Sequence, residues 1–147
     1  QNINSEYHGE EIVFVGLLEG CFPFMSTILN FIDCKHESTF LKISSYKRFK
    51  SGKINLASEL EKEEIYNKNI IIVDDIIDTG KTIAYIKNYL GKMQPKKIKI
   101  ASLLVKDSSL KLSDWFGFKI TNDFVIGYGM DLDDKFRDLK DIYIRKV

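Results

Sequence analysis

The chain has 147 residues, of which 44% are hydrophobic and 29% are charged, and its net charge is +1. This composition is ordinary for a single domain with its own core, and the charge gives no overall field that would draw the chain to nucleic acid or to a membrane surface. No apolar run is long enough to span a bilayer, and no signal peptide is recognisable. The two cysteines, Cys21 and Cys34, suggest no disulfide framework, so we expect reduced thiols and a cytoplasmic protein.

Strands and helices alternate along most of the chain. Apolar and β-branched runs predict strands at residues 12–18, 39–44, 70–73, 98–105, 124–127 and 142–144. A mostly apolar segment after Pro23 predicts a helix at 24–31, and apolar residues at helical spacing predict another at 82–92.

The connecting segments are more polar. We expect a mobile basic loop at 45–53, a charged bridge at 56–66 and a loop at 107–113. The alternation predicts an α/β fold with a mainly parallel central sheet flanked by helices, in which ligands bind at the carboxyl ends of the strands.

The most informative segment is residues 70–82, which read Ile-Ile-Ile-Val-Asp-Asp-Ile-Ile-Asp-Thr-Gly-Lys-Thr. A buried strand leads here into a small-residue turn that opens a helix, where free backbone N–H groups and the helix dipole favour a phosphate. The carboxylates just before the turn suit sugar hydroxyls, a magnesium ion or a proton on a base. The local chemistry therefore indicates a sugar phosphate that also carries a reacting group.

Two other interpretations of this segment explain less. An ATP-binding P-loop would need a glycine at position 75, which is Asp75. A buried strand that ends in an ordinary acidic turn would account for Asp-Thr-Gly alone, but not for the strand, the acids and the helix start together.

The order of features at 70–82 resembles the phosphoribosyltransferases of the type I fold, and further segments resemble the hypoxanthine-guanine branch of that family. Leu18–Phe22 is similar to a pyrophosphate loop, and Ser45-Tyr46 is similar to the start of a mobile catalytic loop. Residues 101–106 are similar to a strand with a purine-selecting lysine. Residues 124–131 with 136–139 are similar to a hood over the purine. The resemblance implies one phosphoribosyltransferase domain over 1–147, with a C-terminal hood formed largely by 107–147. The N-terminal helix of the family is expected to be missing.

The resemblance implies purine salvage, in which the 5-phosphoribosyl group passes from phosphoribosyl pyrophosphate to N9 of hypoxanthine or guanine. It also implies Mg²⁺ as cofactor, phosphoribosyl pyrophosphate and a purine base as partners, and a homodimer or homotetramer without nucleic acid or membrane. Two alternatives stay open. One is a nucleotide-sensing regulator that binds RNA, for which Lys96-Lys97-Ile98-Lys99 is the basic candidate. The other is a relative that prefers xanthine.

By the same resemblance, the phosphoribosyl group would contact Asp74, Asp75, Ile76, Ile77, Asp78, Thr79, Gly80, Lys81 and Thr82. Residues 78–82 would cradle the 5′-phosphate, while Asp74 and Asp75 would meet the ribose hydroxyls directly or through magnesium. Asp78 would be the catalytic residue that exchanges a proton with N7 of the purine.

The purine site would contain Lys106, Phe124, Val125 and Asp131. Lys106 would donate to O6, Phe124 would stack on the base and Val125 would offer its backbone. Asp131 would hold magnesium through water, so the metal-binding residues would be Asp131, Asp74 and Asp75. From the residues alone, Lys106 could equally be a solvated strand end and Phe124 a core residue.

Pyrophosphate would meet Glu19, Gly20 and Arg137, and Ser45 with Tyr46 would close over the reacting centre to exclude water. For Asp131 and Arg137, a surface salt bridge is the alternative. Glu19 departs from the family, because many members have Lys or Arg there, and a non-proline cis peptide bond is often found in this loop. Either only the loop backbone binds, or the affinity for pyrophosphate is reduced. The loop at 45–53 is about one residue shorter than the resemblance implies.

Overall fold

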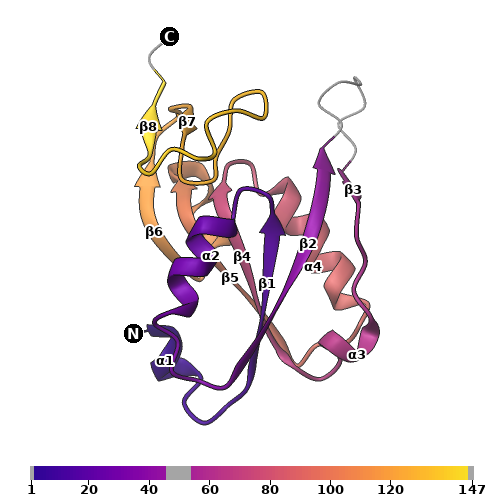
Figure 1. Ribbon diagram of the computed structural model, residues 1–147. Helices are drawn as coiled ribbons and strands as arrows, with labels where there is room; N and C mark the ends of the chain where they lie inside the picture. The colour runs from indigo at the N-terminus through magenta and orange to yellow at the C-terminus, as the bar shows by residue number, and fades with distance from the viewer. Residues whose placement is uncertain (1, 46–53, 146–147) are drawn as a thin grey trace.

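The computed structural model describes residues 2–45 and 54–145. A six-stranded sheet with the order β3-β2-β1-β4-β5-β6 forms the centre of the molecule (Figure 1). Its strands are β1 (Ile12–Leu18), β2 (His36–Ser45), β3 (Ile54–Leu56), β4 (Asn69–Ile77), β5 (Lys97–Lys106) and β6 (Trp115–Ile120).

The order of the strands indicates where a ligand-binding crevice lies in the sheet. β1, β2, β4, β5 and β6 run parallel, and β3 pairs antiparallel with β2 at one edge. The chain passes from β1 to β2 on one side and then returns to β4 on the other side of β1. In open α/β sheets, ligands bind at the carboxyl ends of the strands where this direction reverses. The crevice therefore lies where β1 and β4 end.

Helices cover both faces of the sheet, and alternate residues of β1 face the two cores. Val13 and Val15 pack with the buried side chains of α3 (Lys62–Ile65) and α4 (Lys81–Gly91). Ile12 and Phe14 pack with those of α1 (Asn2–Glu6) and α2 (Phe22–Leu29). Burial on both faces explains why β1 and the start of β4 are continuously apolar rather than alternating.

Residues 121–145 form the hood, which stands at the end of the sheet to which the parallel strands point (Figure 1). Its β7 (Val125–Ile126) and β8 (Tyr143–Ile144) pair antiparallel. Val125 and Met130 pack against Leu103 and Leu104 of β5, which fixes the hood over that strand.

A tight turn at 127–130 docks the hood onto the loop after β1. Gly129 has φ +96°, and a β-carbon there would overlap the carbonyl oxygen of Gly20. The Tyr128 hydroxyl shares a 2.6 Å hydrogen bond with the Thr27 hydroxyl of α2. These contacts hold the hood residues that follow the turn close to the end of β1.

Several elements differ from the sequence predictions. The strand predicted at 70–73 continues to Ile77, because Asp74, Ile76 and Ile77 keep pairing with β5. Residues 115–120, predicted within the hood, form β6 of the central sheet. The predicted loop at 107–113 is mostly a 3₁₀ helix, η1 (Asp107–Leu112), and the short helix α1 precedes β1 where the sequence predicts none.

Candidate functional site

A cavity of about 410 Å³ opens at the carboxyl ends of β1 and β4. Its walls come from the loop after β1, the end of β2, the acidic end of β4, the start of α4 and the hood. The polar side chains that line it are Glu19, Lys42, Asp74, Asp75, Thr82, Asp131, Asp134 and Arg137. The cavity therefore lies at the crevice that the strand order indicates.

Two adjacent carboxylates, Asp74 and Asp75, line the cavity at the end of β4. Asp74 is 7% exposed, and its Oδ1 accepts a hydrogen bond of 3.1 Å from the amide of Asp75. Burial raises the pKa of Asp74 well above its usual value, and the charge of Asp75 raises it further. Burial also raises the pKa of Asp75. Such a pair favours a ligand that brings hydroxyl donors or a cation.

Gly20 lets the loop after β1 pack directly against these acids. A β-carbon at this position would overlap the carboxylate of Asp75. The peptide bond between Leu18 and Glu19 is cis, as the family resemblance implies. The backbone of this loop thus forms the wall of the cavity opposite the acids.

The turn at 78–82, which the sequence predicts to be a phosphate site, leads directly into α4. Gly80 has φ +75° and begins α4 without a side chain to cap the helix. The positive φ favours glycine here, and a β-carbon would also displace the end of the exposed Leu112 side chain of η1. The Ser109 hydroxyl donates to the carbonyl oxygen of Asp78. Because no side chain caps the start of α4, its first amides lack a capping acceptor, a role that an anion could fill.

Asp78 and Lys106 form an ion pair between the turn and the end of β5. The distance from Lys106 Nζ to Asp78 Oδ1 is 2.8 Å, and the lysine side chain is 17% exposed whereas the aspartate side chain is 59% exposed. A carboxylate and an ammonium held side by side offer one acceptor and one donor to a flat ligand edge. Phe124, in the hood, is 45% exposed, so much of its side chain is accessible.

A second charged group joins the loop after β1, β2 and the hood. Glu19 Oε1 lies 3.1 Å from Lys42 Nζ, and Glu19 Oε2 lies 3.7 Å from Arg137 Nε. Arg137 also contacts Asp131 Oδ1 at 3.0 Å and donates to the carbonyl oxygen of Gly129 at 2.8 Å. Arg137 is therefore anchored inside the hood while Glu19 reaches it from the opposite wall.

The structure divides the predicted site residues into separate groups. Glu19, Gly20, Asp74, Asp75, Ile76, Thr82, Asp131 and Arg137 line the cavity. Asp78 and Lys106 pair beside it, and Thr79 and Lys81 are exposed on the turn. Ile77 and Val125 are buried in hydrophobic clusters, so their side chains serve packing. Ser45 ends β2, and Tyr46 lies outside the described residues.

Sequence reasoning missed Lys42 and Asp134, which also line the cavity. In the sequence, Lys42 is only a polar residue among the apolar residues of a predicted strand. Its place beside Glu19 follows from the pairing of Leu18 with Lys42 between β1 and β2. A register between strands is not visible in a single sequence.

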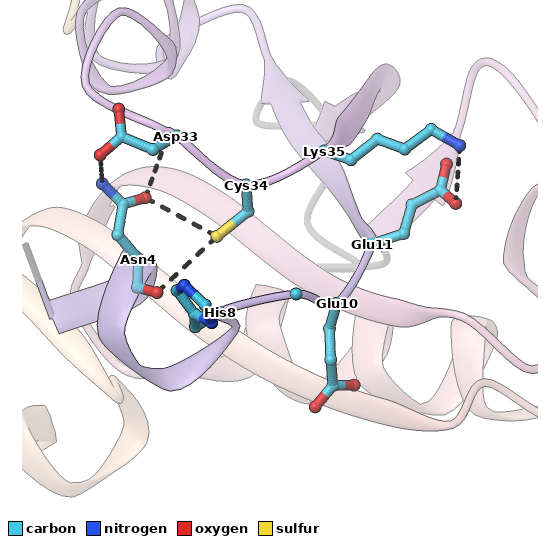
Figure 2. A pocket seen from close by; sticks show the side chains of 8 residues that line it. Asn4, His8, Glu10, Glu11, Asp33, Cys34 and Lys35 are labelled. Carbon is cyan, nitrogen blue, oxygen red and sulfur yellow. Dashed lines mark hydrogen bonds and ion pairs between the residues drawn. The ribbon is translucent and has the colours of Figure 1, made fainter.

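A larger cavity, of about 520 Å³, lies at the opposite end of the sheet, beside α1 and the starts of β1 and β2. Figure 2 shows that several of its polar groups are bonded to one another: Asn4 to Asp33 and Cys34, and Lys35 to Glu11. Its described lining contains none of the predicted site residues. We therefore assign the candidate site to the 410 Å³ cavity.

A protein-family model described as a phosphoribosyl transferase domain matches residues 1–133. The chain is 36% identical over 154 residues to the hypoxanthine phosphoribosyltransferase of Buchnera aphidicola. The alignment covers 100% of this chain and 85% of that protein. It is 32% identical to the bifunctional protein TilS/HprT of Listeria innocua across 99% of this chain, but it spans only 23% of that protein's length.

Solved structures are similar across nearly the whole chain. A hypoxanthine-guanine phosphoribosyltransferase from Bacillus anthracis matches with a TM-score of 0.88 and 33% identity, over 99% of this chain and 88% of that one. A hypoxanthine phosphoribosyltransferase from Trypanosoma cruzi, in complex with the product IMP, matches with a TM-score of 0.85 and 27% identity, over 97% and 83% of the two chains.

Proposed function

The chain belongs to the phosphoribosyl transferase domain family, and we propose that it transfers the 5-phosphoribosyl group of phosphoribosyl pyrophosphate to N9 of hypoxanthine or guanine. The products would be IMP or GMP and pyrophosphate. The observation that carries this proposal is the ion pair of Asp78 and Lys106, which stands beside the uncapped start of α4. Such an arrangement would accommodate a purine edge and a sugar phosphate within one site.

The ion pair matches the edge of a 6-oxopurine. Lys106 would donate to O6, and Asp78 would accept the proton at N7. Lys106 and Asp78 would then bind the base in place of each other. Adenine has an amine at that position, which would set a donor against the lysine. The exposed ring of Phe124 would stack on the base, an interaction worth roughly 1–3 kcal/mol.

The phosphoribosyl group fits between the turn and the acids. The amides of residues 78–82 would hold the 5′-phosphate, with Thr82 on the cavity side. Asp74 and Asp75 would accept hydrogen bonds from the ribose hydroxyls. As the bond from C1 to pyrophosphate breaks, positive charge develops on the ribose, and the two carboxylates would stabilise that charge. Gly20 and Arg137 would meet the departing pyrophosphate.

Magnesium fits this site together with the substrate rather than alone. Among the described residues, no three His, Cys, Asp or Glu side chains converge on one point that could hold a metal ion. Mg²⁺ commonly binds one or two carboxylates plus substrate phosphates and keeps several waters. Asp131, Asp74 and Asp75 are the carboxylates that would hold it, and when bound it would neutralise charge on the pyrophosphate.

Nothing on the basic segment supports an RNA-binding regulator. Lys96 pairs with Glu10 at 2.8 Å, and Lys97 and Lys99 pair with Glu6 at 2.9 and 2.7 Å. The lysines that would form a basic face are thus matched by acids of the same chain. We therefore prefer the enzyme.

The test is release of pyrophosphate from phosphoribosyl pyrophosphate and magnesium, with hypoxanthine, guanine, xanthine and adenine supplied in turn. We expect turnover with hypoxanthine or guanine and little with adenine. Turnover with xanthine alone would replace the substrate in the proposal. Absence of turnover with every base would refute the enzyme.

A further inference from the structure

Glu19 lies between two cations of the cavity. Its Oε1 is 3.1 Å from Lys42 Nζ on β2, and its Oε2 is 3.7 Å from Arg137 Nε in the hood. All of these side chains line the cavity. Among the described residues, no other ion pair connects β2 to the hood, so the carboxylate of Glu19 is the charged link between these two walls.

Arg137 and the backbone of Lys42 are held independently of Glu19. Arg137 is held by Asp131 and by the carbonyl oxygen of Gly129. Lys42 sits on β2, in register with Leu18 of β1, so its backbone is fixed by the sheet. Glu19 itself is on the loop after β1, and its side chain is 52% exposed. An exposed ion pair of this kind is weak and exchanges readily.

The same two cations are what a pyrophosphate needs. A carboxylate oxygen and a phosphate oxygen are both anionic acceptors for ammonium and guanidinium donors. The lining otherwise carries Asp74, Asp75, Asp131 and Asp134, so Lys42 and Arg137 are the cationic side chains among its described residues. An anion that reaches this wall must therefore share or displace the contacts of Glu19.

We propose that Glu19 is an internal competitor of pyrophosphate for Lys42 and Arg137, and that Lys42 is a pyrophosphate-binding residue. This inference rests on the proposed function only for the identity of the anion. Substrate pyrophosphate displaces the carboxylate when it binds, and the carboxylate returns to the cations as the product leaves. The competition weakens the binding of pyrophosphate and favours its release.

The test is titration calorimetry with magnesium pyrophosphate, which needs no turnover. Glu19→Gln keeps the size of the side chain and removes its charge, so it should bind the probe about threefold to tenfold more tightly than the wild type, the range expected when one or two exposed ion pairs are lost. Lys42→Gln should bind it several-fold more weakly. In the double variant, most of the gain from Glu19→Gln should disappear, because one of the released cations is absent.

Glu37→Gln is the matched control, because Glu37 pairs with Lys68 at 3.0 Å near the start of β2, outside the cavity. It should leave the affinity unchanged. Binding of IMP should change less than twofold in every variant, which separates competition at the anion site from a general change of structure. If Glu19→Gln does not fold, Glu19→Ala replaces it with the same expected direction.

Unchanged or weaker binding by Glu19→Gln, or by Glu19→Ala where it replaces Glu19→Gln, overturns the inference. Absence of measurable binding in both the wild type and the variants overturns it as well. Tighter binding by a protein that releases no pyrophosphate with any base would refute only the proposed function. Turnover without tighter binding would refute only the inference.

Discussion

Replacing Gly129 by alanine tests how the hood is docked. Gly129 has φ +96°, a region that L side chains rarely adopt. Its β-carbon would overlap the carbonyl oxygen of Gly20 and would lie 2.8 Å from Pro23 Cδ. A backbone carbonyl cannot rotate away as a side chain does, and Gly20 is itself packed against Asp75. The hood must therefore move away from the loop after β1.

The cost has two parts that a control separates. The left-handed conformation costs a non-glycine residue about 1–2 kcal/mol. Overpacking against atoms that cannot yield costs about 1–3 kcal/mol more. Gly9 has φ +76° but nothing within 4 Å of its would-be β-carbon, so Gly9→Ala carries the first part alone. We expect Gly129→Ala to lose about 2–5 kcal/mol and Gly9→Ala about 1–2 kcal/mol.

Thermal unfolding measures the difference. For a chain of this size, each kcal/mol lowers Tm by roughly 2–4 °C, so Tm should fall by roughly 4–20 °C in Gly129→Ala and by roughly 2–8 °C in Gly9→Ala. The shifted hood carries Arg137 and Phe124, so kcat/KM for pyrophosphate release should also fall by about 100-fold in Gly129→Ala and little in Gly9→Ala. Equal losses of stability in the two variants would refute the docking contact with Gly20.

Three further variants test individual residues. Asp78→Asn should lower kcat by about 10²–10⁴-fold and leave nucleotide affinity within a few-fold, because only proton exchange at N7 is lost; unchanged turnover would exclude Asp78 as the base. Lys106→Ala should raise KM for hypoxanthine and guanine by roughly 10–100-fold and leave KM for phosphoribosyl pyrophosphate nearly unchanged, since a hydrogen bond from a charged donor to O6 is lost. The pKa of Asp74 is raised in the folded chain, so the folded protein without ligand holds the carboxyl proton more tightly than the unfolded chain does. The free energy of unfolding therefore falls as the pH rises from the usual carboxyl pKa through the raised pKa. Asp74→Asn should flatten that pH dependence and raise Tm at pH 7 without ligand. It should also reduce the increase in Tm that added magnesium and phosphoribosyl pyrophosphate produce. A Tm below that of the wild type would show that the buried charge costs nothing.

The sequence predicts best those parts of the site that depend on neighbours along the chain. The strand at 12–18 has the predicted bounds, because its apolar residues are buried on both faces and a glycine turn follows it. The turn at 78–82 opens α4 as predicted, because glycine adopts the left-handed conformation at position 80 without strain. Both signals are local, so one sequence is enough to detect them.

The edge strand β6 was not predicted, although its sequence is rich in aromatic residues. Gly117 interrupts the pattern, and Phe116 and Phe118 are exposed, so the segment shows no buried face. A β-carbon at 117 would lie 2.8 Å from the carbonyl oxygen of Leu103, so the glycine reflects close packing against β5. The reason for this strand lies in a partner far along the chain, which a local pattern does not reveal.

The acids of β4 explain why the sequence predicts the wrong end for the strand at 70–73. Aspartate is rare in strands, so the sequence predicts that the strand ends at Val73. The sheet instead continues, because Asp74 pairs with Ser102 and Ile76 with Leu104 on β5. A strand fixes both carboxylates more firmly than a loop would, and it packs that of Asp75 against Gly20, which suits a site that must hold a ribose in one position. The burial that follows raises their pKa values and opposes their charged forms. Aspartate in a buried strand lowers stability. Such residues are expected at positions where the sequence serves ligand binding rather than stability.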